Sequence, residues 1–390
     1  MAMIRVLEIM PLANSAIAFI GDQLSLFKNN GYETHLICTP DNGINEYVEQ
    51  EGTLYFPLVI PRAIKPFRDI TNIWKIYRYV RKHKIDMVIG HQSKGVLYGM
   101  IAGRLGGAKY RVVLAHGVLE DTMTGMKQKI FATENKLMSS LATHVLCVSP
   151  SVMRRRVELD IDKPEKQSIL GKGTCNGVDA LNKFNPQKVS EETTESIRHK
   201  YGLKKDDFVV GFCGRLVRDK GVTELAGAIK LLKEEHPEVP VKLFVIGNPE
   251  KRDALPDETI NFLKKSDDVI FTGRVEYSEI QNYYTVMDAF VLPSYREGFP
   301  TVVLEASAMA LPLIVSRSTG CIDSIIENQT GVYCDNGSDS IANAIMVFTD
   351  KEKARSYGNA GRQLVLQYFE HTKVKNLMLG FLNKITSVNG

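Results

Sequence analysis

The chain has 390 residues, which is enough for two domains of ordinary size. Hydrophobic residues make up 44% of it and charged residues 24%, a composition typical of a globular rather than a disordered protein. The formal net charge is only +4, whereas nucleic-acid-binding proteins carry stronger and more clustered positive charge, so we expect no nucleic-acid partner.

The cysteines and the N-terminal segment indicate a cytoplasmic protein. Six cysteines are scattered along the sequence without a C-x-x-C pair, and this usage fits a reducing compartment. The segment MAMIRVLEIM contains Arg5 and Glu8 within its apolar run, so it predicts a buried strand rather than a signal peptide. Because no apolar stretch reaches about 18 residues, we expect no membrane-spanning helix.

Apolar runs and amphipathic helical segments alternate through the first half of the chain. Strands are expected over residues 4–10, 32–39, 54–60, 86–91, 110–117 and 144–149. Helices are expected within residues 11–30 and over residues 70–83, 98–105 and 127–142. This alternation predicts a parallel, doubly wound sheet.

The alternation loosens between residues 150 and 207 and then resumes. We interpret the loose segment as an inter-domain connection that contains one helix. Further strands are expected over residues 207–215, 241–247, 268–273, 288–293, 311–316 and 331–334. The chain is therefore expected to form two α/β domains in series, residues 1–200 and residues 201–369.

The segment from Ala289 to Thr319 combines a strand, a loop and the start of a helix. The strand is followed by the loop PSYREGF, and a helix is expected to begin near Pro300, because proline suits the first turn. Unpaired N–H groups and the positive end of the helix dipole then point at the loop, where they can hold a phosphate. The candidate N–H groups belong to Gly298, Phe299 and Thr301.

Two carboxylates frame this anion site. Glu297 lies in the loop and Glu305 about one turn inside the helix. Carboxylates accept charge-assisted hydrogen bonds from sugar hydroxyls, so the combination favours a ligand with both a phosphate and several hydroxyl groups. Acidic residues at the start of a helix also interact favourably with its dipole without any ligand. The alternative is therefore that Glu297 and Glu305 only stabilise the helix.

Two cations follow the first strand of the second domain. Arg215 and Lys220 lie in GRLVRDKG (214–221), at the carboxyl edge where open α/β sheets bind ligands. Together they would neutralise a diphosphate and stabilise it as a leaving group. A solvated basic loop is the alternative, and the nearby carboxylate pair favours the diphosphate site.

His116 closes a strand of the first domain, directly before Gly117. A single histidine is more often a structural group than a catalyst. Its place at a strand end before a glycine-containing loop nevertheless favours a functional role. We expect it to position a ligand by hydrogen bonding rather than to act as a general base.

The segment SYREGFPTVVLEASAMALPLIVS (294–316) as a whole resembles the C-terminal signature of the retaining GT-B glycosyltransferases of family 4. The resemblance implies two Rossmann-like, doubly wound domains with an inter-domain cleft, and sugar transfer from a nucleotide-diphosphate donor with retention of configuration. The first domain would bind the acceptor and the second the nucleotide sugar. A C-terminal helix at about 370–390 would pack back on the first domain.

The same resemblance assigns roles to individual residues. Glu305 would bind the ribose hydroxyls, and Glu297 the 3- and 4-hydroxyls of the donor sugar. Arg215 and Lys220 would stabilise the leaving diphosphate, and His116 would position the sugar. We therefore expect Glu297, His116, Arg215 and Lys220 to form the catalytic set.

The nucleotide base would lie against the turn that opens TGRVEYSEIQNYY (272–284). Backbone groups near Arg274 and Val275 would contact it, and a plain strand-to-helix turn is the alternative. Nothing in this turn distinguishes uracil from adenine or guanine. The donor-nucleotide set that we expect is Glu305, Arg274, Val275, Gly298, Phe299, Pro300 and Thr301.

The first loop departs from the family pattern. Many members carry paired glycines there, which let the backbone approach the donor phosphate, whereas this chain reads LANSAIAFIG (12–21). Asn14, Ser15 and Ala16 are small or polar, so close approach is still feasible. We expect these three residues to form a loop at the donor and acceptor site.

The segment STGCIDS (318–324) resembles family members that build bacterial surface polysaccharides with N-acetylated aminosugars. It implies a UDP-N-acetylaminosugar donor and a polyprenyl-diphosphate-linked saccharide acceptor. The alternatives are another nucleotide sugar with a soluble acceptor, a GT-B epimerase or phosphorylase and, more distantly, a non-catalytic nucleotide-sugar-binding protein. A dinucleotide-dependent oxidoreductase would need G-x-G-x-x-G after the first strand, which is absent.

We expect neither a metal nor a cofactor. Asp160 and Asp162 form a D-x-D sequence, which binds Mn²⁺ or Mg²⁺ in another glycosyltransferase fold, but here it lies in a polar connection. Arg215 and Lys220 supply the positive charge that the diphosphate needs. The nucleotide sugar itself is a substrate.

The segment from Arg62 to Lys84 contains eight basic residues and one acidic residue, Asp69, with Trp74 and Tyr77 between them. As a helix it could lie on an anionic bilayer at the inner face of the plasma membrane and reach a lipid-linked acceptor. The alternative is a helix that docks on the first sheet and exposes a solvated basic face.

Overall fold

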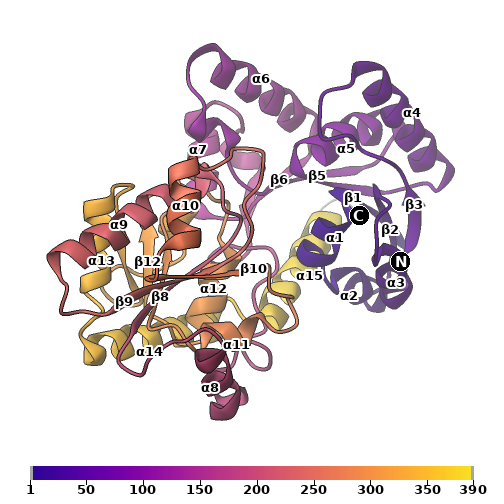
Figure 1. Ribbon diagram of the computed structural model, residues 1–390. Helices are drawn as coiled ribbons and strands as arrows, with labels where there is room; N and C mark the ends of the chain where they lie inside the picture. The colour runs from indigo at the N-terminus through magenta and orange to yellow at the C-terminus, as the bar shows by residue number, and fades with distance from the viewer. Residues whose placement is uncertain (1–2, 388–390) are drawn as a thin grey trace. The chain divides into compact units, whose positions relative to one another are not determined.

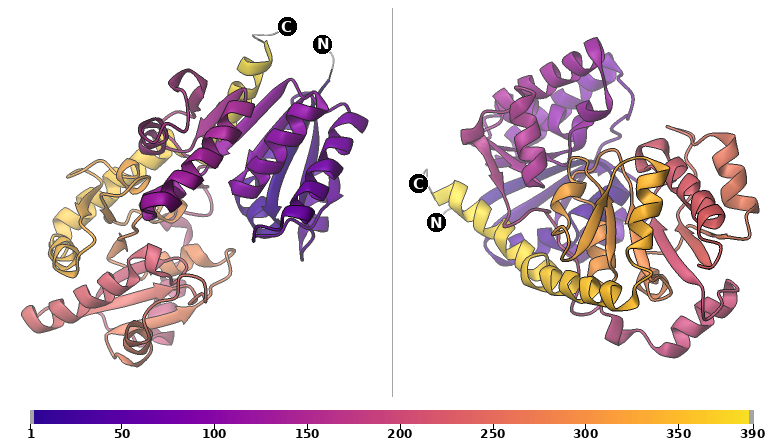
Figure 2. Two further views of the ribbon diagram at one scale, coloured as in Figure 1. Left: turned by 90° about the horizontal axis from the view of Figure 1, so that it is seen from above. Right: turned by 90° about the vertical axis from the view of Figure 1, so that its left-hand side faces the viewer.

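The computed structural model describes residues 3–387, which fold into two compact α/β units (Figures 1 and 2). Unit 1 comprises residues 3–176 and 373–387, and unit 2 comprises residues 177–372. The boundary therefore follows residue 176, not residue 200 as predicted. The reason is that α8 (Glu191–Lys200) packs against α11 (Ile280–Tyr284) of unit 2, where the hydroxyl oxygens of Thr194 and Thr285 are 2.9 Å apart.

Unit 1 is built on a seven-stranded parallel sheet with the order β3-β2-β1-β4-β5-β6-β7. Strands covered on both faces are continuous apolar runs, and the buried run of β4 has this character. This confirms the predicted parallel, doubly wound sheet. The strands are β1 (Ile4–Leu12), β2 (Tyr32–Thr39), β3 (Leu54–Pro57), β4 (Met87–His91), β5 (Tyr110–Ala115), β6 (His144–Cys147) and β7 (Gln167–Ile169).

Helices cover both faces of this sheet, as the ribbon in Figure 1 shows. One core contains Leu7 and Val88 and lies under α4, α5 and α6, whereas the other contains Met10 and Leu36 and lies under α1, α2 and α3. The helices of unit 1 are α1 (Ala13–Phe19), α2 (Gln23–Asn29), α3 (Ile44–Glu51), α4 (Pro66–Lys82), α5 (Gln92–Gly106), α6 (Gly125–Leu141), α7 (Pro150–Glu158) and most of α15 (His371–Ser387).

Several boundaries differ from the sequence prediction. Helix α4 begins at Pro66 rather than at residue 70, because proline suits its first turn and the N–H of Asp69 already bonds the Lys65 carbonyl at 2.8 Å. Strand β3 ends at Pro57 rather than at residue 60. Helices α3 and α7 and strand β7 were not predicted, since they are short and the three residues of β7 are only half-buried.

Unit 2 is built on a six-stranded parallel sheet with the order β10-β9-β8-β11-β12-β13. The strand order reverses between β8 and β11, and the corresponding reversal in unit 1 lies between β1 and β4. Such switch points are where open α/β sheets bind ligands. The strands are β8 (Phe208–Cys213), β9 (Val241–Ile246), β10 (Val269–Gly273), β11 (Ala289–Leu292), β12 (Leu313–Ser316) and β13 (Gly331–Cys334).

Helices also flank the sheet of unit 2. Helix α9 packs against α10 and α13, and α12 packs against α14. Besides α8 and α11, the helices are α9 (Val222–Glu235), α10 (Asp257–Lys265), α12 (Thr301–Ala308), α13 (Ser338–Met346) and α14 (Lys351–Tyr368).

Helix α15 begins in unit 2 and continues into unit 1. There the Tyr32 hydroxyl donates to Asn383 Oδ1 at 2.6 Å, and the Tyr110 hydroxyl donates to the Thr386 carbonyl at 3.2 Å. The end of the expected helix, residues 388–390, lies outside the described residues. Between residues 3 and 387, no helix has the length and apolar character needed to cross a membrane.

Candidate active site

The loop between β11 and α12 lies at the switch point of unit 2 and is held tightly. The N–H of Glu297 donates to the Thr319 carbonyl at 2.9 Å. Gly320 has a φ of +83°, and a Cβ there would lie 2.5 Å from the carbonyl oxygens of Glu297 and Gly298. Only glycine fits this approach, so the loop conformation depends on Gly320.

The side chains of Glu297 and Lys220 form an ion pair in this loop. Lys220 Nζ donates to Glu297 Oε1, and the Ser294 hydroxyl donates to the same oxygen at 2.9 Å. Both charged side chains are largely buried, with exposed fractions of 14% for Glu297 and 16% for Lys220. The structure thus brings together two residues predicted to act on the sugar and on the diphosphate, and Ser294 is a partner that the sequence did not indicate.

Arg215 follows β8 on the same edge of the sheet. Its Nη1 lies 3.2 Å from Glu250 Oε2, and its side chain remains mostly exposed. The Arg215–Glu250 ion pair therefore lies at the surface. A third cation, Arg296, pairs with Asp219 at 2.5 Å and fastens the β11–α12 loop to the loop after β8.

Glu305 lies on α12 and is buried. The Tyr284 hydroxyl donates to its Oε2 at 2.9 Å. Burial raises the pKa of Glu305 to about 7, and the Tyr284 hydrogen bond and the nearby Lys183 charge limit this rise. Lys183 in turn lies 3.0 Å from the ring centroid of Tyr277, and burial lowers its pKa to about 8. Sequence reasoning missed Tyr284, which closes the segment TGRVEYSEIQNYY but was given no role there, and Lys183, which lies in no recognisable motif.

The remaining residues of the expected nucleotide set lie around α12 and after β10. Pro300 caps α12, one residue before the helical position that the sequence predicted for it. Phe299 is buried and its ring centroid lies 5.3 Å from that of Phe369, so its side chain belongs to the core. Arg274 is exposed, with a 4.0 Å ion pair to Glu276. Gly298, Thr301 and Val275 are half-buried.

The expected loop at Asn14, Ser15 and Ala16 is not a loop. Strand β1 continues to Leu12, and the three residues lie in helix α1. Alanine favours the helix, and Ala16 is fully buried in the core under α1, so this packing determines the local structure. Asn14 remains exposed.

His116 follows β5 and belongs to a chain of three polar side chains in unit 1. Its Nε2 lies 3.1 Å from Nδ1 of His91, whose Nε2 lies 2.5 Å from Oε2 of Glu8. Glu8 and His91 are buried, whereas His116 is partly exposed. Burial and the neighbouring His91 lower the pKa of His116 to about 3. The sequence did not single out Glu8 or His91 as partners.

Helix α4 combines a docked face with an exposed apolar and basic face. Asp69 and Ile76 face inward, where Lys94 Nζ lies 2.6 Å from Asp69 Oδ2. Phe67, Ile70 and Trp74 are exposed by 90%, 66% and 53%. The exposed basic side chains of the segment are Arg62, Lys65, Arg68, Lys75, Arg78, Arg81, Lys82 and Lys84.

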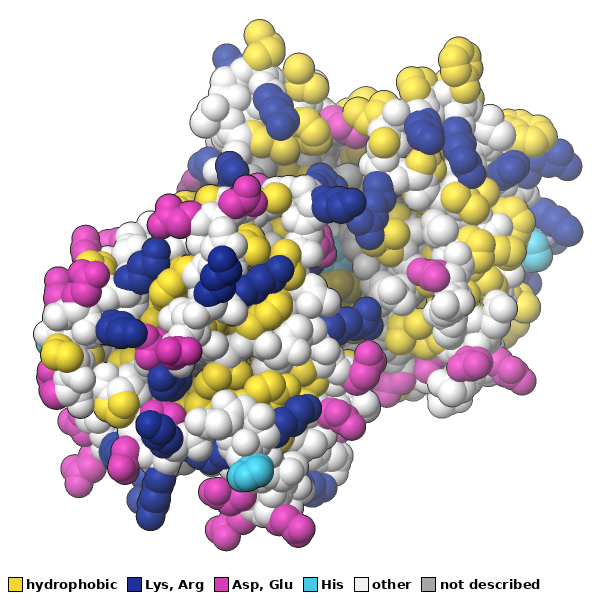
Figure 3. Space-filling model, in the orientation of Figure 1, with side chains coloured by type: hydrophobic (Ala, Val, Ile, Leu, Met, Phe, Trp, Pro, Cys, Tyr) yellow, Lys and Arg dark blue, Asp and Glu magenta, His cyan; other side chains and the backbone are white. Residues whose placement is uncertain are grey.

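Figure 3 shows that apolar (yellow) and basic (dark blue) side chains alternate on the surface around α4 and α6, and that acidic side chains are few there. Helix α6 exposes Met126 and Ile130 between Lys127, Lys129 and Lys136. A hollow of about 540 Å³ adjoins α4, lined in part by Leu58, Val59, Phe67, Arg68 and Lys75. Helix α4 packs on unit 1, as the docking-helix alternative of the sequence analysis predicted. Its outer face also exposes more apolar surface than is usual for a face that only contacts water.

The D-x-D carboxylates have separate partners. Asp162 is buried, and the Arg156 guanidinium donates to both of its oxygens, at 2.5 and 3.0 Å. Asp160 is exposed and pairs with Lys136. Asp162 therefore has a structural role at the end of α7.

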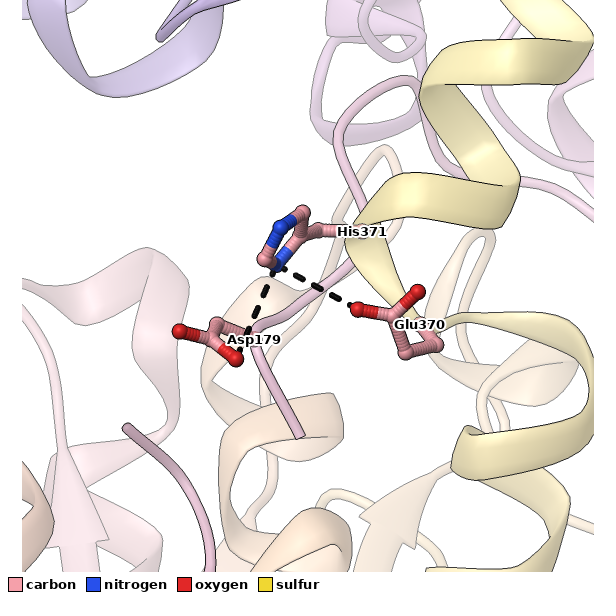
Figure 4. A group of neighbouring side chains, drawn as sticks. All are labelled: Asp179, Glu370 and His371. Carbon is pink, nitrogen blue, oxygen red and sulfur yellow. Dashed lines mark ion pairs between the residues drawn. The ribbon is translucent and has the colours of Figure 1, made fainter. Parts of the chain in front are cut away.

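Within residues 3–387, the side chains of Asp179, Glu370 and His371 come close enough to hold a cation (Figure 4). His371 Nδ1 lies 3.5 Å from Glu370 and 3.8 Å from Asp179. Asp179 also accepts from the Asn182 N–H and Glu370 from the Thr372 N–H, each at 2.9 Å. The carboxylates thus cap local turns, and the cluster fastens the start of α15 to the segment at Val178, whose carbonyl accepts from the His371 N–H.

Both units match known protein families. Residues 18–167 match the model of a glycosyl transferase 4-like domain, and residues 193–364 match that of glycosyl transferases group 1. The chain is 27% identical to the capsular polysaccharide biosynthesis glycosyltransferase CapM of Staphylococcus aureus, over 91% of each chain. It is 28% identical to the UDP-Gal:alpha-D-GlcNAc-diphosphoundecaprenol alpha-1,3-galactosyltransferase of Escherichia coli, over 94% of this chain and 92% of that protein.

The fold also matches solved structures. Anabaena HepE in complex with UDP and glucose has a TM-score of 0.79 at 17% identity, over 98% of this chain and 100% of that one. At this identity the likeness shows the fold, which is GT-B. Together with the two family models, it shows that the chain belongs to the group 1 glycosyltransferases with a glycosyl transferase 4-like N-terminal domain, and that it is an enzyme of the glycosyltransferase class.

Proposed function

We propose that this glycosyltransferase moves a sugar from a UDP-sugar to a polyprenyl-diphosphate-linked saccharide in the synthesis of a bacterial surface polysaccharide. The observation that carries the proposal is the arrangement at the switch point of unit 2. There a buried carboxylate, Glu305, lies on the helix that begins beside the Glu297–Lys220 pair. The names of two relatives support this proposal, since one acts on a diphosphoundecaprenol-linked sugar with UDP-Gal and the other makes capsular polysaccharide.

Each side chain has a chemical role in this proposal. Glu305 accepts hydrogen bonds from the ribose hydroxyls, and Glu297 accepts from hydroxyls of the donor sugar. Lys220, Arg215 and the N-terminus of α12 stabilise the negative charge of the leaving diphosphate. Because Lys220 pairs with Glu297, a bound diphosphate has to share this cation or draw it away.

The transfer step that we propose retains the anomeric configuration. The bond between the anomeric carbon and the β-phosphate oxygen breaks, and the acceptor oxygen bonds the same carbon from the same face. The proton of the acceptor hydroxyl passes to the departing phosphate oxygen. Arg215 and Lys220 supply the countercharge, so we expect a chelator to leave the transfer rate unchanged. The expected sugar is an N-acetylaminosugar, as the resemblance of STGCIDS implies.

A lipid-linked acceptor lies in a membrane, and the surface formed by α4 and α6 has side chains that could contact one. We propose that this surface contacts an anionic membrane peripherally, because apolar side chains such as Phe67 and Trp74 can enter the headgroup region while Arg68, Lys75 and Arg78 contact the lipid phosphates. Such a contact would bring unit 1 to a lipid-linked acceptor.

Nucleotide binding is the first test of the proposal. The melting temperature is measured with UDP, GDP, ADP and dTDP, for the wild type and for Glu305→Ala. A ligand at 100 times its dissociation constant adds about 2.7 kcal/mol to the free energy of unfolding, which is a measurable shift. We expect UDP to give the largest shift and Glu305→Ala to lose it. If no nucleotide shifts the melt at millimolar concentration, the role of Glu305 and the transferase site are wrong.

Product analysis separates transfer from the alternatives. Incubation with UDP-N-acetylglucosamine and a polyprenyl-diphosphate-linked saccharide should release UDP and lengthen the acceptor by one residue. Release of free sugar epimer or sugar phosphate would instead show an epimerase or a phosphorylase, and tight UDP-sugar binding without any product would show a sensor.

Sedimentation with anionic vesicles tests the membrane contact. Replacing Lys75, Arg78, Arg81 and Lys82 by Gln removes four exposed charges from α4 and should weaken binding at least tenfold, since each basic residue contributes about 1 kcal/mol. The matched control replaces four exposed lysines of unit 2, Lys264, Lys265, Lys351 and Lys353. Equal losses in both variants would reduce the contact to non-specific attraction.

A further inference from the structure

Lys183 carries a half-buried ammonium group that has no hydrogen-bond acceptor in unit 2. Its Nζ lies 3.0 Å from the ring centroid of Tyr277 and 5.3 Å from that of Phe184. Within the described residues 3–387, Nζ makes no ion pair and donates to no oxygen. Because an ammonium group has three N–H donors and its burial is costly while they stay unpaired, a ligand oxygen beside Lys183 would be bound favourably.

The backbone around Lys183 is fixed within unit 2. Phe184 is 1% exposed, and Arg362 Nη1 donates to its carbonyl at 3.1 Å. Arg362 Nη2 donates to the Ala180 carbonyl at 3.2 Å, and the N–H of Phe184 donates to the Asp179 carbonyl at 2.8 Å. These contacts hold the Cα atom of Lys183 in place, so only its side chain can adjust to a ligand.

Lys183 lies beside the part of unit 2 that is proposed to hold the nucleoside. Glu305 lies four residues after Thr301, where α12 begins, and is therefore about 6 Å along the helix from the end proposed to bind the diphosphate. The charge of Lys183 acts on Glu305. Tyr277 lies in the turn between β10 and α11, which is expected to contact the base. The ammonium group thus lies near both the ribose carboxylate and the turn expected at the base.

The ammonium group of Lys183 is charged at neutral pH. Burial lowers its pKa to about 8, and the charges of Glu305 on α12 and of Asp179 in its own turn oppose this effect. The third titratable group that faces it is the hydroxyl of Tyr277. Although Tyr277 as a residue is exposed, burial around its hydroxyl group raises the pKa of that group, so it is neutral.

The two carbonyl oxygens of uracil differ in their distance from the ribose. O2 is bonded to the carbon next to N1, the nitrogen of the glycosidic bond, whereas O4 is bonded to the carbon opposite N1. A donor beside the carboxylate that binds the ribose therefore meets O2 rather than O4. Cytosine has the same O2, so such a contact adds affinity for a pyrimidine nucleotide without separating uracil from cytosine.

We propose that Lys183 is a nucleotide-binding residue whose Nζ donates a hydrogen bond to O2 of the pyrimidine base. The ring of Tyr277 covers one side of the ammonium group and leaves the donors on its other side for the base. The inference rests on the proposed function, because it takes Glu305 as the partner of the ribose. It adds a side chain that recognises the base, for which the sequence indicated the backbone near Arg274 and Val275.

Calorimetry with UDP, 2-thio-UDP and 4-thio-UDP tests this contact in the full-length protein. Each analogue replaces one carbonyl oxygen of uracil by sulfur, which is a weaker hydrogen-bond acceptor. All three ligands share the ribose and the diphosphate, so the ratios of their dissociation constants cancel the contacts of Glu305, Arg215 and Lys220. We expect the wild type to bind 2-thio-UDP about tenfold more weakly than UDP, the lower end for a charged donor, because Lys183 is only half-buried.

A double-mutant cycle between protein and ligand assigns this effect to Lys183. Lys183→Met removes the ammonium group and keeps an unbranched side chain. It should weaken the binding of UDP, and of CDP with the same O2, by about tenfold, and it should abolish the difference between UDP and 2-thio-UDP. The ratio of UDP to 4-thio-UDP should stay at its wild-type value. Lys183→Arg keeps a charged donor and should retain part of the 2-thio difference.

Lys200→Met is the matched control. Lys200 ends α8 of unit 2, is exposed, and its Nζ lies 5.1 Å from the ring centroid of Tyr201. The change removes the same charge from another contact between a lysine and a tyrosine ring. It should leave the dissociation constants of UDP and both analogues within about twofold of the wild-type values.

Each outcome decides the inference. A wild type that binds 2-thio-UDP as tightly as UDP overturns it without any variant, so the test holds even if Lys183→Met does not fold. A loss in Lys183→Met that is equal for UDP and both analogues also overturns it, since the lysine would then act on the phosphates or on the fold. Coupling of Lys183 to the 4-thio substitution instead would show that O2 is the wrong atom.

Failure of this inference differs from failure of the proposed function. If UDP binds and the sugar is transferred without any coupling between Lys183 and O2, the base contact alone is wrong. If the coupling is measured but no sugar is transferred, the transferase function is wrong and the base contact stands. If no nucleotide binds, both are wrong.

Discussion

At the scale of single residues, unit 2 holds opposite charges in direct contact at its candidate site. Lys220 and Glu297 are both largely buried, so each depends on the other for compensation of its charge. The Ser294 hydroxyl shares the Glu297 oxygen that receives the lysine. The pair therefore holds both side chains in place, and electrostatic catalysis at the proposed site would require such preorganisation.

Substitution within this pair should separate stability from activity. We expect Glu297→Gln and Lys220→Met each to lower turnover by a factor of about 100 or more and the free energy of unfolding by about 1–3 kcal/mol, because each leaves a largely buried group without its partner. The double variant should regain part of the stability and none of the activity. Denaturant unfolding and UDP-release kinetics measure both quantities. Stability losses that simply add would show that the two groups are not coupled.

Glu305 presents a different situation, because the effect of burial on its carboxyl group outweighs that of the nearby Lys183 charge and of the Tyr284 hydrogen bond. Burial raises its pKa from 4.5 to about 7. The native protein thus binds this proton more tightly than the unfolded chain does, and the stabilisation present below pH 4.5 is lost as the pH rises toward 7. The proposed ribose contact uses the ionised form as a hydrogen-bond acceptor, so the site would trade stability for this acceptor at neutral pH.

The stability difference between the wild type and Glu305→Gln should therefore depend on pH. Between about pH 4.5 and pH 8 we expect the wild type to lose up to about 3 kcal/mol relative to the variant, the equivalent of the shift in the Glu305 pKa. Urea unfolding of both proteins at several pH values measures this. A difference that stays constant with pH would mean that Glu305 is ionised throughout.

At the scale of elements, the sequence predicted the β11–α12 segment closely because one pattern supports every part of it. A four-residue apolar strand, a polar loop, a proline at the helix start and a second strand follow one another, and the structure has all four. Asn14, Ser15 and Ala16 show the opposite case. Their small side chains are compatible with a loop or a helix, and only the burial of Ala16 against the core under α1 selects the helix.

The sequence patterns could not predict side-chain contacts between residues that lie far apart in the chain. Glu8 and His91 are separated by 83 residues and meet only through the register of β1 and β4. Tyr284 and Glu305 meet only through the packing of α11 and α12. A single sequence shows periodicity and local motifs, whereas these contacts depend on which strands become neighbours.

Besides the apolar core, one buried carboxylate joins α4 to α5. Asp69 accepts from Lys94 Nζ at 2.6 Å, from the Tyr98 hydroxyl and from the Lys65 N–H at 3.0 Å. Although burial acts to raise the pKa of Asp69, the hydrogen bonds from Lys94 and Tyr98 lower it overall. Its contribution to stability is therefore present at neutral pH and lost as the pH falls through that lowered value.

Asp69→Asn should loosen this attachment. We expect a loss of about 1–3 kcal/mol in the free energy of unfolding, because the change removes the ion pair and leaves Lys94 largely buried without a counter-charge. The matched control is Asp160→Asn, which breaks the exposed pair with Lys136 and should change stability by less than about 0.5 kcal/mol. If the two variants are equally stable at neutral pH, Asp69 does not anchor α4.

At the scale of the whole molecule, the chain returns to unit 1 through its last helix. After Thr372 at the end of unit 2, α15 buries Val374, Met378, Phe381, Leu382 and Ile385 in unit 1. Tyr32 on β2 and Tyr110 on β5 both donate hydrogen bonds to this helix. The fold of unit 1 therefore depends on residues that lie beyond the whole of unit 2 in the sequence, whereas the nucleotide site proposed above uses residues of unit 2 alone.

This division predicts that damage to α15 weakens unit 1 and spares nucleotide binding. Leu382 is fully buried, so Leu382→Ala should lower the free energy of unfolding by about 2–5 kcal/mol. Leu377 lies on the same helix and is 42% exposed, so Leu377→Ala should cost far less and serves as the control. The dissociation constant of UDP, measured by calorimetry, should stay within about twofold of the wild-type value in both variants. If UDP binding weakens in Leu382→Ala in proportion to the lost stability, the nucleotide site depends on α15, and unit 2 alone does not form it.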